Sequence, residues 1–214
     1  SNDPQLVLDD GQFRVFSVIW RAVLQDTFPH RLLLVHAGPG CGKSQLSRAL
    51  LWAMGGAVLL TATTNAAAKV IKGQTIWRAL KINRTNVTKD LVSVGLAKLQ
   101  DEFDQVRCLL VDEVSMMATS LLSCVDRRLR QAARPTPATN ANLESAPPFG
   151  GFVVVLCGDF FQLPPVGGLP LYAADNDSND TIKRFLLCEL EAQHRCSGGS
   201  EADQRHRQRI LDMR

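Results

Sequence analysis

The stretch LLLVHAGPGCGKSQLSRALL, residues 32–51, decides how the rest of the chain is interpreted. It begins with four apolar residues, 32–35, which predict a short buried strand in the middle of a sheet. A glycine-rich turn follows directly, and a helical pattern begins near Lys43. The order strand, glycine-rich turn, helix is typical of a phosphate-binding loop.

The residue types in this turn fit the binding of a nucleotide with Mg2+. Glycines adopt backbone angles that let successive N–H groups point at an anion, and the positive end of the next helix adds to the attraction. In the Walker A motif the lysine reaches the β- and γ-phosphates, and the following hydroxyl is a magnesium ligand. Ala37 stands where the motif usually has its first glycine, and a small residue there still allows a sharp turn. The predicted nucleotide-binding residues are Gly38, Gly40, Cys41, Gly42, Lys43 and Ser44.

The composition predicts a soluble globular protein. With 214 residues and 45% apolar content, the chain can form one large packed domain. Its longest apolar runs, such as 152–157, fall far short of the roughly 20 residues that span a bilayer, so no membrane partner is expected. Six scattered cysteines without a C-x-x-C pair indicate an intracellular, reducing compartment. A net charge of +3 is too small to indicate nucleic acid by itself.

A second motif follows another buried run. The sequence RCLLVDEVSMM, 107–117, predicts a strand, then two adjacent acids, then a helix. In a chain with a phosphate loop this order matches the Walker B motif, with Asp112 as a magnesium ligand and Glu113 orienting or deprotonating the attacking water. Acids that merely decorate a helix N-terminus are the alternative, which the matching order of the two motifs disfavours.

Polar residues also end the predicted strand 57–65. The carboxyl ends of parallel strands line the ligand crevice of an open sheet, so Thr61, Thr63, Thr64 and Asn65 are expected to face the substrate. Thr64 or Asn65 as an ordinary helix cap is an equally supported alternative.

A third buried strand is predicted within 150–158, and polar residues follow it. Asp159 and Gln162 emerge at its carboxyl end, where Gln162 is expected to sense the γ-phosphate.

Two residues are open to two interpretations each. Gln12 starts a predicted helix, 11–26, with Asp9 or Asp10 as its cap; its amide can pair with an adenine edge or can be solvated. Trp77, in a turn and short helix at 73–80, can stack on a base or pack in the core, and the core is favoured for a lone tryptophan.

Three segments are predicted to lie outside the site. Residues 81–105 form a small insertion on the sheet, and 121–133 form an amphipathic helix whose arginines are expected to make a solvated face. Residues 134–148 are rich in Pro, Ala, Thr and Asn without periodicity, which predicts a mobile surface loop.

Taken in order, GPGCGKS, TATTNAAA, GQTI, DEVSMM, PFGG, GDFFQLPPV and QHR resemble the superfamily-one DNA helicases of the Pif/RecD-like branch, in particular the Pif-type and Helitron-type helicases. PFGG and GDFFQLPPV are the most specific of these motifs. The resemblance covers about Leu8 to Arg195 and implies an α/β P-loop NTPase fold, a RecA-like parallel sheet flanked by helices. It further implies a first RecA-like motor domain at 1–195, with 196–214 as a linker or the start of a second RecA-like domain that the chain lacks.

The same resemblance implies an ATP-dependent DNA helicase that moves 5′ to 3′ along single-stranded DNA, with ATP and Mg2+ as cofactors. Such an enzyme serves DNA repair and recombination, in the nucleus or mitochondrion if the source is eukaryotic. The positions of the motifs imply a role for each matching residue. The resemblance implies an adenine-reading role for Gln12 and metal-binding roles for Ser44 and Asp112. It implies catalytic roles for Lys43, Asp112, Glu113, Gln162 and Arg195, and DNA contacts for Thr63, Asn65, Thr75 and Trp77.

Two other functions remain open. One is a nucleotide-dependent binding module without turnover, and the other is a P-loop ATPase that acts on a partner other than DNA. The presence of both Walker B acids, Gln162 and Arg195 favours the enzyme. The chain by itself is expected to be weakly active or inactive, since the ATP site of these helicases lies between two RecA-like domains.

Overall fold

A six-stranded sheet organises the computed structural model, which describes residues 7–133, 146–172 and 181–191. The strands lie in the order β3-β2-β4-β5-β1-β6, and every neighbouring pair is parallel. Their carboxyl ends therefore meet at one edge of the sheet, here called the carboxyl edge. The strands are β1 (Leu32–Ala37), β2 (Val58–Ala62), β3 (Gln74–Thr75), β4 (Cys108–Asp112), β5 (Val153–Gly158) and β6 (Leu186–Leu190).

The apolar runs of the sequence form the inner strands. Every residue of β4 and β5 is buried, as expected for strands covered on both faces. β1 alternates between buried and half-buried residues, with Leu33 and Val35 completely buried. The predicted strand at 32–35 is confirmed, and it continues to Ala37, where the phosphate loop begins.

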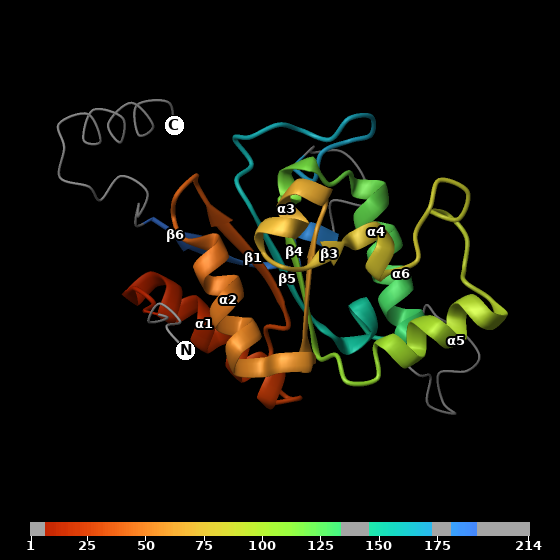
Figure 1. Ribbon diagram of the computed structural model, residues 1–214, viewed down its shortest axis with the longest axis horizontal. Helices are drawn as coiled ribbons and strands as arrows, with labels where there is room; N and C mark the ends of the chain where they lie inside the picture. Colours follow the sequence, from red (N-terminus) through yellow and green to blue (C-terminus); the bar gives the residue numbers. More distant parts are fainter. Residues whose placement is uncertain (1–6, 134–145, 173–180, 192–214) are drawn as a thin grey trace.

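Helices cover both faces of the sheet (Figure 1). One face packs against α1 (Asp10–Leu24), α2 (Lys43–Met54) and α3 (Asn65–Val70). The other packs against α4 (Ile76–Ala79), α5 (Ser93–Glu102) and α6 (Thr119–Ala132). Short 3-10 helices lie at η1 (Gly55–Ala57), η2 (Val114–Met116) and η4 (Pro148–Gly151). The predicted α/β fold, a parallel sheet flanked by helices, is confirmed.

Local capping sets where α1 and α3 begin. The Asp9 carboxylate accepts a hydrogen bond from the Gln12 N–H (2.8 Å), and the Gln12 Oε1 accepts one from the Asp9 N–H (3.1 Å). This reciprocal pair is a capping box. Thr64 caps α3 by accepting a hydrogen bond from the Ala67 N–H (3.2 Å). Of the predicted alternatives, Asp9 rather than Asp10 is therefore the N-cap of α1, and Thr64 rather than Asn65 is the N-cap of α3.

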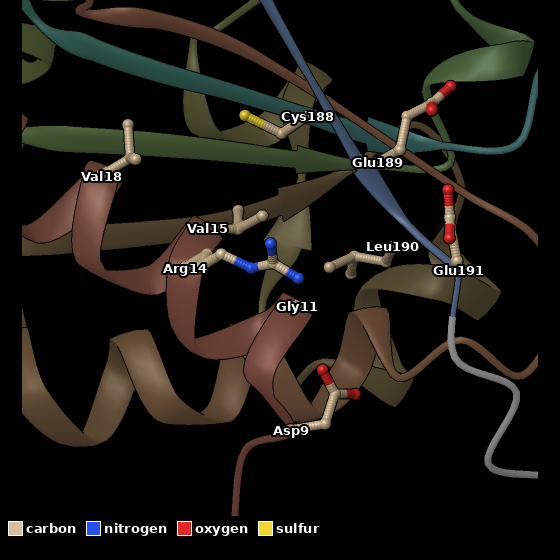
Figure 2. Close-up of a pocket in the computed structure, with 9 residues that line it drawn as sticks. All are labelled: Asp9, Gly11, Arg14, Val15, Val18, Cys188, Glu189, Leu190 and Glu191. Atoms are coloured by element: carbon tan, nitrogen blue, oxygen red, sulfur yellow. The ribbon is translucent and has the colours of Figure 1, made fainter.

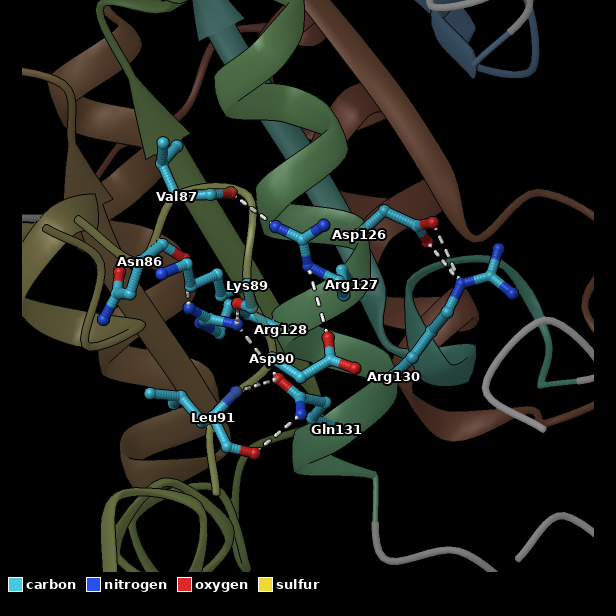
Figure 3. A network of polar contacts seen from close by, with 10 residues as sticks. All are labelled: Asn86, Val87, Lys89, Asp90, Leu91, Asp126, Arg127, Arg128, Arg130 and Gln131. Carbon is cyan, nitrogen blue, oxygen red and sulfur yellow. Dashed lines mark hydrogen bonds and ion pairs between the residues drawn. The ribbon is translucent and has the colours of Figure 1, made fainter. Parts of the chain in front are cut away.

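The arginines of α6 do not form the predicted solvated face (Figure 3). Arg128 is completely buried, and its guanidinium donates to the carbonyl oxygens of Asn86 (2.9 Å) and Lys89 (2.8 Å). Arg127 donates to a third carbonyl of the same loop. The prediction was wrong because a helical pattern locates the polar face of a helix, whereas the loop that covers this face is distant in sequence.

Loop 86–91 is held at further points by α6. Gln131 donates to the Leu91 carbonyl oxygen (3.0 Å) and accepts from the Leu91 N–H (3.1 Å). Arg127 also lies 3.5 Å from the Asp90 carboxylate. The predicted insertion at 81–105 thus comprises this loop and α5, and α5 packs on α6.

The PFGG turn, η4, precedes β5 and therefore lies at the edge opposite the carboxyl edge. Phe149 is completely buried, and its N–H donates to the Asp126 carboxylate on α6. Phe149 and Gly150 both have positive φ, 52° and 62°. A Cβ added to Gly150 would lie 2.4 Å from the Leu129 carbonyl oxygen, so the turn fits against α6 only with glycine at this position.

Several predictions fall outside the residues that the structure describes. These are residues 134–145 of the loop predicted at 134–148, Arg195 and the segment 196–214. In the described part of the chain, no helix has the length and apolar character needed to cross a bilayer.

Candidate nucleotide site at the carboxyl edge

The phosphate loop joins β1 to α2 at the carboxyl edge. Gly40 and Gly42 have φ angles of 82° and 78°, which glycine adopts without a steric penalty. Gly42 is the N-cap of α2, so the loop leads directly into a helix N-terminus, where backbone N–H groups attract an anion. Gly38 and Cys41 are buried beneath the loop, and Ser44 is half-buried in the first turn of α2. The local geometry is the one that the sequence predicts.

Lys43 lies back over this loop. Its ammonium donates to the carbonyl oxygens of Ala37 (2.7 Å) and Gly38 (3.1 Å). Those two bonds use two of the three N–H donors of an ammonium group. One N–H donor is left for a further acceptor, such as a phosphate oxygen.

Asp112 and Glu113 stand at the end of β4. Asp112 is 6% exposed, and its Oδ1 accepts a hydrogen bond from the Glu113 N–H (2.9 Å). Burial raises the pKa of Asp112, while that hydrogen bond and the charge of Lys43 lower it. Burial and the charge of Asp112 raise the pKa of Glu113; Lys43 opposes the shift and Asp159 adds to it. The charge of Lys43 therefore acts on both acids at the end of β4, and that of Asp159 acts on Glu113.

Glu113 has an unusual backbone conformation. Its φ and ψ of 58° and 42° lie in the left-handed region, which costs a residue with a Cβ roughly 1–2 kcal/mol. The next residue, Val114, packs closely on the end of β5. A Cβ added to Gly158 would lie 2.7 Å from the Val114 Cγ1 and 2.9 Å from its N. Sequence reasoning missed Gly158, although a glycine directly before the Asp159 of a motif is a signal for such close approach.

The turn that follows β5 carries Asp159 and Gln162; it is called the sensor turn here because the sequence predicts that Gln162 senses the γ-phosphate. Asp159 is buried and accepts a hydrogen bond from the Phe161 N–H (3.1 Å), and its carbonyl accepts one from the Gln162 N–H (3.0 Å). Gln162 is exposed at the carboxyl edge, as predicted. Phe160 stacks on His36, with ring centroids 6.0 Å apart. Sequence analysis missed this contact, which joins the residue before the phosphate loop to the sensor turn.

The residues predicted to contact DNA lie at the end of β3 or just beyond the ends of β2 and β3. Asn65 is exposed, and Thr75 caps α4 by accepting from the Arg78 N–H (3.3 Å). Trp77 is 37% exposed, so the interpretation that it packs in the core is wrong. Its neighbour Ile76 is completely buried and takes the core position of this short helix.

Thr61 and Thr63 both bind backbone carbonyls. Thr61 is completely buried and donates to the Leu110 carbonyl oxygen (2.7 Å), so the expectation that it faces the crevice is wrong. It lies within β2, beside the β4 strand that carries this carbonyl. Thr63 is half-buried and donates through its Oγ1 to the Glu113 carbonyl oxygen (2.9 Å).

Gln12 is 2% exposed, so the solvated alternative for this residue is wrong.

A hollow of about 690 Å³ lies between α1 and β6, near the start of α1 (Figure 2). None of the phosphate-loop residues lines this hollow, so it is distinct from the phosphate site. Its lining residues are Asp9, Gly11, Arg14, Val15, Val18, Cys188, Glu189, Leu190 and Glu191.

The oxygen donors near Lys43 fit a magnesium ion that arrives with a nucleotide. The Ser44 hydroxyl and the Asp112 carboxylate are of the type that Mg2+ prefers. Across the described residues, no group of three or more His, Cys, Asp or Glu side chains is arranged to hold a metal.

Asp112→Asn is expected to raise the melting temperature of the nucleotide-free chain by a few degrees. Burial raises the pKa of Asp112 above its value in the unfolded chain, so the folded state loses stability as the pH rises through that pKa. At neutral pH a neutral amide removes this cost and can still accept from the Glu113 N–H. Thermal unfolding at pH 7 measures the change, with the exposed Glu189→Gln as control. A lower melting temperature for Asp112→Asn alone would contradict the expected direction.

The chain is similar in sequence to known DNA helicases. The family model described as PIF1-like helicase matches residues 7–206. The ATP-dependent DNA helicase Pif1 of Psychrobacter sp. (strain PRwf-1) is 32% identical over 155 residues, which are 68% of this chain and 22% of that protein.

Two solved structures are similar in fold. The Pif1 helicase from Candida albicans has a TM-score of 0.63 at 22% sequence identity. The match covers 97% of this chain and 43% of the Candida chain. A Pif1 helicase from Bacteroides in complex with ADP-AlF3 and ssDNA has a TM-score of 0.63 at 21% identity, over 90% of this chain and 44% of its own. The chain spans about a fifth of the length of the curated relatives that it matches.

Proposed function

The chain belongs to the PIF1-like helicases, and from this premise we propose that it is part of a motor that couples ATP hydrolysis to 5′-to-3′ movement along single-stranded DNA. In this proposal residues 1–195 are the first RecA-like domain, and 196–214 lead into a second. The observation that carries it is the position of Asp112 and Glu113 at the end of β4, close enough to Lys43 of the phosphate loop for its charge to lower the pKa of both acids. ADP-AlF3 and ssDNA in the complex of the Bacteroides relative support the same assignment.

Nucleotide binding is assigned to the first part of the chain. The N–H groups of the loop between Gly38 and Ser44 surround the phosphates, and Lys43 donates to the β- and γ-phosphates. Gln12 reads the adenine. Ser44 and Asp112 hold Mg2+, which neutralises charge on the phosphate oxygens when it is bound.

Hydrolysis is assigned to Glu113, Gln162 and Arg195. Glu113 orients the attacking water and takes its proton. Its left-handed backbone supports this role, because strained residues gather at functional sites. Gln162 contacts the γ-phosphate from the exposed end of the sensor turn. Arg195 stabilises the charge of the transferring phosphoryl group, in the manner of an arginine finger.

Single-stranded DNA is assigned to the ends of β2 and β3. Asn65 and Thr75 contribute polar contacts, Thr63 belongs to the same segment, and the exposed ring of Trp77 stacks on a base. Phe161 is 70% exposed at the same edge and is a second stacking surface that sequence analysis did not identify. Stacking on aromatic rings tolerates any base sequence, as a translocating motor requires.

A reducing intracellular compartment is part of the proposal, namely the nucleus or mitochondrion in a eukaryote, with a role in DNA repair or recombination. The five cysteines of the described residues carry free thiols, and four of them are buried, which supports this location.

The ATPase activity of the full-length parent protein tests the proposal. Single-stranded DNA is expected to stimulate turnover several-fold, and Lys43→Ala is expected to remain at background with or without DNA. Turnover that DNA does not change would indicate a P-loop ATPase acting on another partner. Nucleotide binding without turnover would indicate a binding module, and either result would reject the helicase.

A further inference from the structure

We propose that Thr63 is a positioning residue that connects the DNA-facing segment after β2 to the catalytic Glu113. The inference rests on the proposed function and assigns Thr63 a role in hydrolysis in addition to its place beside the DNA. It follows from two hydrogen bonds, one backbone conformation and the chemistry of a hydroxyl group.

Thr63 binds the Walker B turn at two points. Its N–H donates to the Asp112 carbonyl oxygen (3.2 Å), which extends the β2–β4 pairing one residue beyond Ala62. Its Oγ1 then donates to the Glu113 carbonyl oxygen (2.9 Å). Both carbonyls of the acidic pair are therefore held from the neighbouring strand.

The second bond acts on a residue whose backbone needs support. Glu113 lies in the left-handed region, a conformation that persists only where the surroundings fix it. On one side, Gly158 allows the end of β5 to approach the turn closely. On the other, the Thr63 hydroxyl fixes the carbonyl of Glu113 itself. Together these contacts hold Glu113 in place for the attacking water.

The same bond limits what Thr63 can offer to DNA. A hydroxyl group has one hydrogen to donate, and that of Thr63 is used on the Glu113 carbonyl. Phosphodiester oxygens accept but do not donate, so Thr63 cannot give a hydrogen bond to the DNA backbone while it holds Glu113. A direct DNA contact through this hydroxyl would require release of the catalytic turn.

DNA can act on Thr63 through its neighbours. Thr64 caps α3, and Asn65, the first residue of that helix, is exposed. A DNA contact at Asn65 lies two residues from the hydroxyl that holds Glu113. Movement of this short segment therefore changes the position of Glu113, which gives a physical route by which DNA binding raises the rate of hydrolysis.

Two substitutions in the full-length parent test the link. Thr63→Val removes the hydroxyl at nearly constant shape, and Thr63→Ser keeps it. We expect Thr63→Val to lower the DNA-stimulated kcat about tenfold, the equivalent of one net hydrogen bond of about 1.4 kcal/mol. The KM for ATP and the Kd for a fluorescent single-stranded oligonucleotide should stay close to wild type, and the melting temperature should fall by no more than a few degrees. Thr63→Ser should restore kcat, and Thr88→Val, at an exposed threonine, should have no effect.

Three outcomes would overturn the inference. Weaker DNA binding with an unchanged kcat at saturating DNA would make Thr63 a simple DNA contact. A lower melting temperature without a kcat effect would make it purely structural, and failure of Thr63→Ser to restore kcat would exclude the hydroxyl. Failure of the proposed function is visible separately, because wild-type turnover would then not respond to DNA, and the basal kcat of Thr63→Val would still test the link to Glu113.

Discussion

Glu113→Gln is expected to reduce ATP hydrolysis by about 100- to 10,000-fold, the usual contribution of a general base, and to leave nucleotide binding intact. The amide has nearly the shape of the carboxylate but cannot take a proton from water. The substitution also removes a negative charge beside Asp112 and Asp159, so binding of an anionic nucleotide should be equal or slightly tighter. Steady-state ATPase of the full-length parent and titration with a fluorescent ATP analogue measure the two properties.

Two further variants serve as controls for this measurement. Lys43→Ala should lose both properties, because the lysine acts on the phosphates themselves. Glu102→Gln changes an exposed acid on α5 whose ion pair with Lys81 lies on the surface, and it should lose neither property. Turnover near wild type in Glu113→Gln would show that another group activates the water.

Arg128→Ala is expected to lower the free energy of unfolding by about 3–5 kcal/mol. The guanidinium is completely buried and supplies hydrogen bonds to two carbonyls of loop 86–91 and to the Gln131 side chain (3.0 Å). Its removal leaves the carbonyls of Asn86 and Lys89, which are partly buried, without this donor, and it also removes a large buried side chain; an unsatisfied buried acceptor costs about 1–3 kcal/mol. Chemical denaturation of the chain measures the loss.

The expected loss is a large part of the stability of a typical domain, about 5–15 kcal/mol, so Arg128→Ala can fail to fold. Arg128→Lys keeps the stem and one cationic donor and should lose less. Arg84→Ala, at an exposed arginine of the same insertion, is the matched control and should change the free energy by under about 0.5 kcal/mol. A loss for Arg128→Ala as small as that of the control would mean that the loop is held by other contacts.

The strands and motifs of the site could be predicted because each is specified by residues that are adjacent in the sequence. A run of apolar residues that ends in glycines or acids specifies a buried strand and the chemistry at its end, as at 32–44 and 107–113. The parallel arrangement then brings these ends to one edge without any knowledge of strand order. This is why Lys43, Asp112 and Gln162 lie at the edge where the sequence predicts them.

The partners of individual side chains could not be predicted, because they depend on contacts between distant segments. Thr61 and Thr63 belong to the same polar end of a predicted strand. Thr61 is buried and donates to a carbonyl of β4, whereas Thr63 is half-buried and donates to the carbonyl of Glu113, fifty positions away. The same reason applies to Arg128, whose acceptors lie about forty positions earlier. The role of Arg195 stays a prediction.

The PFGG turn has a consequence for how related sequences are judged. It lies at the edge of the sheet that carries no chemistry, and its positive φ angles and its glycine fit against α6 are requirements of folding. A relative that had lost Lys43 or Glu113 would still need this turn to place β5. PFGG, one of the two motifs most specific for the family, therefore gives no evidence on whether a given member is an active enzyme.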